Sequence, residues 1–151
     1  VDGIAIGIGT TMLFHCDYVL ASTTATFATP FIHLGLVPEA ASSLLMPRTM
    51  GHQRAFATLV MGRTMHADAA REAGFVNEVV APGHTEAEAR KAAREICALP
   101  AEAVAISRKL LKLAPEDLTR RIDQESHLFG ERMRSKEAVA AFKAFFARKK
   151  A

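Results

Sequence analysis

The stretch "GIAIGIGTT" near the beginning of the chain has residue types and a spacing that could do chemistry, because it places Gly3, Gly7 and Gly9 among apolar residues. We predict a strand that turns sharply at Gly7-Ile8-Gly9 and enters a helix over residues 10–15. Glycine permits positive φ at such a turn, and the first amides of a helix point outward at its positive end. The turn could therefore hold an anion, either a bound phosphate or an oxyanion that forms only during a reaction.

Two other interpretations of this turn need to be weighed. The dinucleotide-binding fingerprint has glycines in the order G-x-G-x-x-G and an acidic residue about 20 residues later. This chain has neither that spacing nor an acid at that distance, so the fingerprint is excluded. A glycine-rich turn can also serve only to let a strand and a helix pack. On the residues of the turn alone, packing is the favoured interpretation, since short motifs often occur without function.

A second candidate for chemistry is Glu39, in the stretch "GLVPEAASS". A carboxylate can take up and return protons as a general base and acid. Pro38 followed by Glu39 is also an ordinary helix start, with proline at the first helical position and an acid favoured by the helix dipole. On these residues alone the helix start is the favoured interpretation. The two interpretations are compatible, because an acid at a helix start can also face a pocket.

The elements that must position these residues fall into two regions. Up to about Pro82, short apolar runs alternate with Gly, Thr and Pro, whereas from Thr85 onward the chain is rich in Ala, Glu, Lys, Arg and Leu. In the first region we predict strands at 18–22, 25–29 and 75–80, and helices at 39–51, 52–62 and 67–74. Four more helices are predicted at 85–99, 101–114, 116–133 and 135–150. Thr85 and Glu88 have capping-box spacing at the first of these. We therefore expect an α/β region over 1–82 and a helical region over 83–151 that packs on a partner subunit.

The composition excludes several classes of protein. The 151 residues are half apolar, carry a formal charge of +3 and contain no apolar run long enough to span a bilayer. The opening stretch lacks the features of a secretory signal, so a cytoplasmic location is expected. Basic residues cluster late without interleaved aromatics, which disfavours nucleic acid as a partner. The histidines show no spacing for a metal site. Cys16 and Cys97 are expected to be small buried thiols rather than a disulfide.

Three stretches of the first region carry a resemblance to a known family. The stretches are "VDGIAIGIGTTMLFHCDYVLAS", "ATFATPFIHLGLVPEAASS" and "MGRTMHADAAREAGFVNEVV". In order and spacing they are similar to successive signatures of the enoyl-CoA hydratase/isomerase family, also called the crotonase family. The resemblance implies an α/β fold, the C-terminal half of a crotonase-like ββα spiral followed by α-helices that mediate oligomerisation. It also implies that a segment on the order of a hundred residues precedes Val1. That segment would contain the other oxyanion-hole loop and much of the coenzyme A site.

The resemblance further implies roles for single residues. Hydratases of the family carry two glutamates, at the places of Thr11 and Phe31 here. Glu39 instead matches the single catalytic glutamate of the 3-enoyl-CoA to 2-enoyl-CoA isomerases, and the stretch around it is most similar to their peroxisomal-type branch. Glu39 would then be the proton shuttle, and the Ile8 backbone N–H would donate to the thioester oxyanion. The residues assigned to substrate binding are Gly7, Gly9, Thr11, Phe31, His33 and Leu36. His33 on its own is more simply an ordinary packed histidine, and Asp17 is assigned a structural role.

These roles predict isomerisation of 3-enoyl-CoA to 2-enoyl-CoA in fatty acid β-oxidation, with a coenzyme A thioester as the substrate and no metal or separate cofactor. The 151-residue chain alone is expected to be inactive, because it would supply only one of two oxyanion donors. Two alternatives stay open: another reaction of the family such as enoyl-CoA hydration, and a non-catalytic module for acyl-CoA binding or assembly. The expected partners are an acyl-CoA and further copies of the chain in a trimer or hexamer, without nucleic acid or membrane.

Overall fold

Two small sheets form the centre of the molecule. The computed structural model describes residues 1–148. Strand β1 (Ile4–Ile6) pairs in parallel with β3 (Thr26–Ala28), and β3 pairs in antiparallel fashion with β4 (Met65–His66). Strand β2 (Leu20–Ser22) pairs in parallel with β5 (Glu78–Val80) in the second sheet. The strand predicted before the glycine turn is β1, and the strands predicted at 18–22, 25–29 and 75–80 are present in shorter form, whereas β4 was not predicted. The chain crosses between the two sheets.

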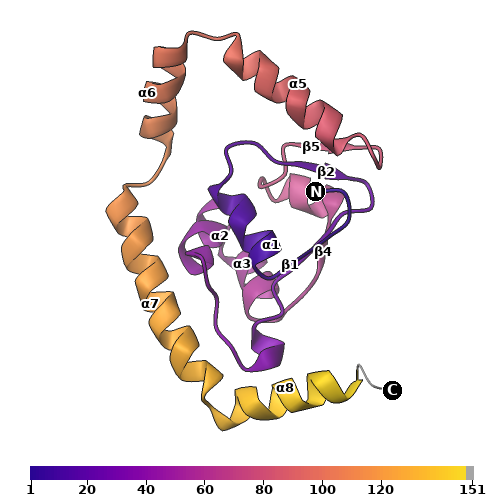
Figure 1. Ribbon diagram of the computed structural model, residues 1–151, viewed down its shortest axis with the longest axis vertical. Helices are drawn as coiled ribbons and strands as arrows, with labels where there is room; N and C mark the ends of the chain where they lie inside the picture. Colours follow the sequence, from indigo (N-terminus) through magenta and orange to yellow (C-terminus); the bar gives the residue numbers. More distant parts are fainter. Residues whose placement is uncertain (149–151) are drawn as a thin grey trace.

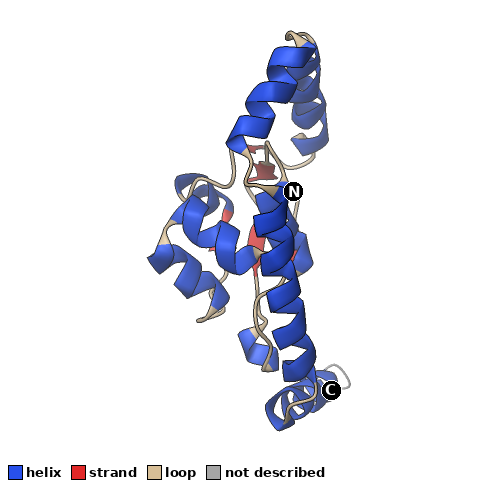
Figure 2. Ribbon diagram, turned by 90° about the vertical axis from the view of Figure 1, so that its left-hand side faces the viewer, coloured by secondary structure: helices blue, strands red, loops and turns tan. Residues whose placement is uncertain are grey.

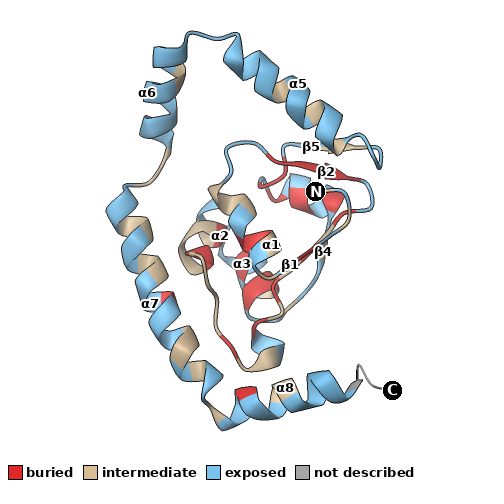
Figure 3. Cartoon of the chain, viewed as in Figure 1, coloured by how far each residue is buried: buried red, intermediate tan, exposed pale blue. Residues whose placement is uncertain are grey.

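Short helices cover these sheets and enclose the core. They are α1 (Ile8–Thr11), the 3-10 helices η1 (Met12–His15) and η2 (Ile32–Leu34), α2 (Ser42–Met50), α3 (His52–Leu59) and α4 (Ala67–Glu72). Phe27 of β3 is fully buried, and its ring meets the ring of Phe75 edge to face at 5.1 Å between centroids. Phe14 stacks on Phe75 with 4.8 Å between the ring centroids. Aromatic pairs of this kind anchor a core. Figure 3 shows that most of the buried residues lie on the central strands and the short helices around them.

Four C-terminal helices surround this core as an open arc (Figure 1). They are α5 (Thr85–Cys97), α6 (Ala101–Leu111), α7 (Pro115–Met133) and α8 (Lys136–Arg148), and we call them the helical arc. Figure 2 shows from the side that the arc extends beyond the core at both ends. No residue of α5 or α6 is buried. No helix within residues 1–148 is both long enough and apolar enough to cross a membrane.

The predicted division after residue 82 lies in the loop between β5 and α5. Residues 149–151, which the predicted helical region includes, lie outside the described part of the chain. The capping box predicted at Thr85 is wrong, because the N-cap is His84 and no side chain caps the helix. The prediction that both cysteines are buried is also wrong. Cys16 and Cys97 are both exposed free thiols. Cys97 is exposed because it lies on α5, a helix that buries no residue.

Candidate active site

The glycine turn is sharper and begins earlier than predicted. Gly7 has φ 58° and ψ −123°, and its amide still donates to Ala28 O at 2.9 Å, which continues the pairing of β1 with β3. The chain therefore turns at Gly7 alone. Helix α1 begins at Ile8 rather than at Thr10, and Gly9 belongs to the helix without a positive φ. A side chain at position 7 would be strained whatever the space around it.

Helix α1 leaves amides without partners at its beginning. The amides of Thr10 and Thr11 donate to Gly7 O at 2.9 and 3.0 Å, and Thr10 Oγ1 donates to Ala5 O at 2.8 Å. Within residues 1–148, the backbone amides of Ile8 and Gly9 have no hydrogen-bond acceptor. An acceptor from outside the chain can therefore reach the Ile8 N–H, which lies at the positive end of a helix.

Glu39 lies one turn of this helix away from Ile8. It belongs to the segment between η2 and α2, and Thr11 Oγ1 donates to Glu39 Oε1 at 2.5 Å. The Thr11 side chain is fully buried, so the bond is made on the inner side of α1. The structure thus brings the glycine turn, Thr11 and Glu39 together. Thr11 and Glu39 are 28 residues apart in the sequence.

The helix-start interpretation of Glu39 is wrong. Helix α2 begins at Ser42, with Ala41 as its N-cap, so Pro38 is not the first helical residue and Glu39 is not in the first turn. The reason is that Ala40 and Ala41 take left-handed φ values of 56° and 55°, which residues with a side chain rarely adopt. Glu39 therefore lies in a tight loop rather than on a helix.

The other predicted site residues are buried to different extents. Phe31 and Leu36 are buried in the core, with 8% and 5% of their surfaces exposed. The Phe31 ring meets that of Phe129 in α7 edge to face. His33 is exposed at one side of η2, and its imidazole packs over Gly62, where an added Cβ would overlap the ring. The role of His33 in substrate binding stays a prediction.

Two residues that the sequence analysis missed also contact the loop that carries Glu39. His15 Nε2 lies 2.7 Å from Ala40 O, and the buried carboxylate of Glu125 accepts the Ala41 amide at 2.6 Å. Glu125 comes from α7, more than 80 residues later in the chain. No local sequence signal distinguishes it from the exposed acids of the same helix.

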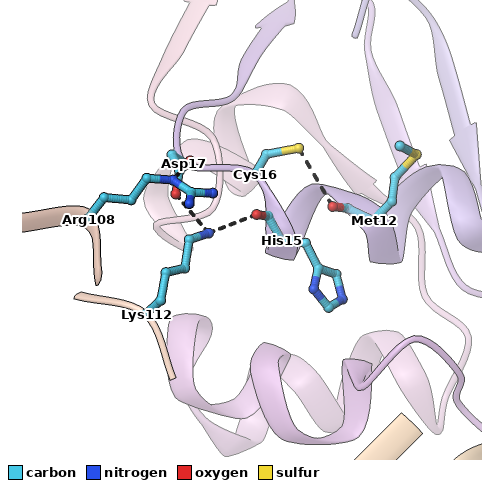
Figure 4. A network of polar contacts seen from close by, with 6 residues as sticks. All are labelled: Met12, His15, Cys16, Asp17, Arg108 and Lys112. Atoms are coloured by element: carbon cyan, nitrogen blue, oxygen red, sulfur yellow. Dashed lines mark hydrogen bonds and ion pairs between the residues drawn. The ribbon is translucent and has the colours of Figure 1, made fainter. Parts of the chain in front are cut away.

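A polar network lies beside the loop (Figure 4). The Asp17 carboxylate accepts hydrogen bonds from Lys112 Nζ at 2.8 Å and from Arg108 Nε at 2.7 Å. Lys112 Nζ also donates to His15 O at 2.8 Å. The hydrogen bonds from Lys112 and then Arg108 lower the pKa of Asp17 below its ordinary value of 3.8. Asp17 is therefore a charged anchor that ties α6 to the core, which is a structural role.

Residues of this network, together with apolar residues of the core and the arc, line a cavity of about 740 Å³. Its lining is mostly apolar, with Phe14 of η1, Leu45 of α2, Leu99 between α5 and α6, and Leu111 of α6, and it also includes Arg108 and other polar groups. Neither Thr11 nor Glu39 lines it, so the cavity and the Thr11–Glu39 pair are separate places. Within residues 1–148, no group of three or more His, Cys, Asp or Glu could hold a metal ion.

Comparison with known proteins decides the family. Residues 1–151 match the sequence model of the family described as "Enoyl-CoA hydratase/isomerase". The chain belongs to the enoyl-CoA hydratase/isomerase family. A crystal structure of an enoyl-CoA hydratase/isomerase from Pseudoalteromonas atlantica T6c has the same fold, with a TM-score of 0.94 at 40% identity over 98% of this chain. The expected crotonase fold is thereby confirmed.

Members of the enoyl-CoA hydratase/isomerase family with different named reactions are similar to this chain. Enoyl-CoA delta isomerase 2 of Rattus norvegicus is 35% identical over 99% of the chain. A probable enoyl-CoA hydratase of Rhizobium meliloti (strain 1021) is 32% identical over 100% of it. The chain spans 38% and 59% of the lengths of these two relatives, and 60% of the Pseudoalteromonas chain. Membership of the family is thus shown, and the reaction has to be inferred from the site.

Proposed function

We propose that the protein carrying this chain isomerises 3-enoyl-CoA to 2-enoyl-CoA, with Glu39 as the single proton shuttle. The observation that carries the proposal is the hydrogen bond from the buried Thr11 hydroxyl to Glu39, one helical turn from the Ile8 amide. Thr11 and Phe31 stand where the resemblance places the two glutamates of a hydratase. Neither side chain can activate a water molecule as a carboxylate would.

The chemistry needs one carboxylate that takes a proton and gives it back. Glu39 removes a proton from C2 of the 3-enoyl thioester, and the electron pair of the broken C–H bond delocalises into a dienolate. The protonated Glu39 then returns a proton at C4, which leaves the double bond between C2 and C3 and restores the carboxylate. Thr11 holds Oε1 throughout, so the other oxygen, Oε2, is the one that moves the proton.

Stabilisation of the dienolate is assigned to the glycine turn. Its negative charge collects on the thioester oxygen, and the Ile8 N–H can donate to that atom because it has no acceptor within residues 1–148. The resemblance places the second donor on a segment outside this chain. The substrate is a coenzyme A thioester, and no step of this mechanism uses a metal.

The substitution Glu39→Gln in the intact protein tests the proposal. Glutamine keeps the size of the side chain and an oxygen that can accept from Thr11, but it cannot take a proton. We expect kcat for isomerisation to fall by about a hundredfold to ten-thousandfold, while the acyl-CoA still binds and stability changes little. The control is Glu72→Gln, an exposed acid at the end of α4. A near-normal kcat in Glu39→Gln would rule out Glu39 as the proton shuttle, whereas an intact wild-type protein that binds acyl-CoA without turning it over would favour the non-catalytic module for acyl-CoA binding or assembly.

A second candidate function is hydration of a 2-enoyl-CoA, which is favoured by the likeness to the probable hydratase of Rhizobium meliloti. Glu39 would then act on a water molecule, and a second acid would have to come from a segment outside this chain. The two reactions are separated by their products from one preparation. An isomerase converts 3-enoyl-CoA into 2-enoyl-CoA and stops, whereas a hydratase converts 2-enoyl-CoA into a hydroxyacyl-CoA.

A further inference from the structure

Glu125 is the only buried residue of α7, with 5% of its surface exposed. Its Oε2 accepts the Ala41 amide at 2.6 Å. Its Oε1 accepts the Ser43 amide at 3.0 Å and the Ser43 hydroxyl at 2.5 Å. Arg121, one turn earlier on α7, donates to Ser43 Oγ at 3.0 Å. A buried carboxylate is normally kept only where such bonds compensate for lost water, and the proposed reaction does not use this one.

The bonds of Glu125 explain the unusual backbone of the loop. Ala40 and Ala41 have left-handed φ values, and such conformations persist only where the surroundings impose them. The turn aims the amides of Ala41 and Ser43 at one point at the start of α2, a nine-residue helix whose N-terminus favours negative charge. The carboxylate and the turn therefore stabilise each other.

The same loop is held on its other sides as well. His15 Nε2 contacts Ala40 O at 2.7 Å, between Glu39 and the residue that Glu125 binds. At the beginning of the segment, Arg132 Nε of α7 donates to Gly35 O at 3.0 Å. Helix α7 thus bonds both ends of the segment 35–43, which contains Glu39.

We propose that Glu125 is a positioning residue for Glu39. By fixing the left-handed turn at Ala40 and Ala41, it sets the place from which the Glu39 carboxylate meets the Thr11 hydroxyl and the substrate. This inference rests on the proposed function of Glu39 and assigns a task to the helical arc, which sequence analysis had linked only to oligomerisation.

The test is Glu125→Gln in the intact protein, with Asp123→Asn as the control, since Asp123 is an exposed acid on the same helix. In the glutamine, an NH2 group replaces one of the two carboxylate oxygens. This NH2 group and the backbone amide of Ala41 or Ser43 are both donors, so one of the hydrogen bonds to the loop is lost. We expect kcat to fall about tenfold or more with KM changed less than threefold, because substrate binding does not depend on the turn. The assays are run at a temperature where the variant has the circular dichroism of the wild type.

A second measurement does not depend on which reaction the protein catalyses. Amide hydrogen exchange of Ala41 and Ser43 should become at least tenfold faster in Glu125→Gln and stay unchanged in Asp123→Asn. If Glu125→Gln fails to fold, Ser43→Ala removes one bond to Glu125 Oε1 and should lower kcat about threefold to tenfold. Unchanged exchange at Ala41, or a normal kcat despite faster exchange, would overturn the proposal. Full activity of Glu39→Gln would instead overturn the proposed function and leave the exchange result standing.

Discussion

At the scale of single residues, the buried hydroxyl of Thr11 decides how the Glu39 carboxylate is presented. The hydroxyl is 2.5 Å from Glu39 Oε1 and 3.4 Å from Gly7 O, so it lies between the glycine turn and the acid. A threonine can orient a carboxylate without competing for the proton of the substrate. The residue thus serves the single-acid chemistry proposed for Glu39.

Replacing Thr11 by valine should therefore have a moderate effect. Thr11→Val keeps the shape of the side chain but leaves Glu39 Oε1 without its donor. We expect kcat to fall by no more than about tenfold, because the base itself remains. The free energy of unfolding should fall by about 0.5–1.5 kcal/mol for the lost hydrogen bond. Steady-state kinetics and urea denaturation measure the two effects. A loss of a thousandfold would mean that the hydroxyl takes part in the chemistry.

At the scale of elements, the arc is held to the core through close contacts with short loops. Gly35 ends η2 with φ 68°, and a Cβ built on it would lie 2.9 Å from the backbone N of Ala138 in α8. Ala138 is itself fully buried. The end of η2 and the first turn of α8 can therefore approach each other only because no side chain stands at position 35.

The substitution Gly35→Ala tests this close approach. Gly83→Ala is the matched control, because Gly83 also has a positive φ of 80° but nothing within 4 Å of the added Cβ. Both variants should lose about 1 kcal/mol to backbone strain. Gly35→Ala should lose a further 1–3 kcal/mol because α8 has to move. Thermal denaturation of the two variants gives the difference, and equal losses would show that α8 is not packed on Gly35.

The tie between α6 and the core should depend on pH. Because the folded-state pKa of Asp17 lies below 3.8, its bonds to Lys112 and Arg108 stabilise the fold above that value. Their contribution is lost as the pH falls through the lower, folded-state pKa. The pair is half exposed, so Asp17→Asn should cost at most about 1 kcal/mol at pH 7. The difference from the wild type should shrink below about pH 4. A difference that stays constant from pH 7 to pH 3 would contradict the assignment.

Sequence patterns predicted the elements of this molecule better than they predicted the loop that carries Glu39. Short apolar runs predicted every strand except the two-residue β4, and glycines such as Gly51 and Gly74 ended the helices close to where expected, since these signals act over a few residues. The left-handed turn at Ala40 and Ala41 has no such local signal. It is imposed by Glu125 from a helix far along the chain, which is why the start of α2 was misplaced.

The partners of Glu39 show the same limit. The glycine turn and Glu39 were found from residue types and from resemblance, but the bond between Thr11 and Glu39 joins two loops whose approach depends on the whole core. His15 was not singled out because a lone histidine has many ordinary roles, and its contact with Ala40 O appears only in three dimensions.

At the scale of the whole molecule, the described chain exposes more surface than a compact monomer does. Its accessible surface is 9794 Å², whereas a compact monomer of its 16.3 kDa exposes about 7,500 Å². Large apolar side chains contribute to the excess, among them Ile4 of β1 (77% exposed) and Leu110 and Leu111 of the arc (81% and 87%). Exposed apolar surface of this extent is typical of a protein that has partners.

We therefore expect this surface to be covered, either in a homo-oligomer of the trimer or hexamer type or by the part of the relatives' length that this chain does not span. An excess of roughly 2,300 Å² is in the range of surface that permanent interfaces bury. Sedimentation velocity at micromolar concentration measures the assembly directly. A monodisperse monomer of this chain alone across that range of concentration would contradict the prediction.

The bond between Ala41 and Glu125 joins residues 84 positions apart, and this separation has a consequence for the order of folding. Closing so long a loop is entropically unfavourable, and contacts of this kind slow folding. A ribosome adds about 5–20 residues per second, so Glu125 is synthesised roughly 4–17 seconds after Ala41. During that time the turn beside Glu39 has no carboxylate to hold it. The nascent chain thus carries its proposed proton shuttle before it can hold that residue in place.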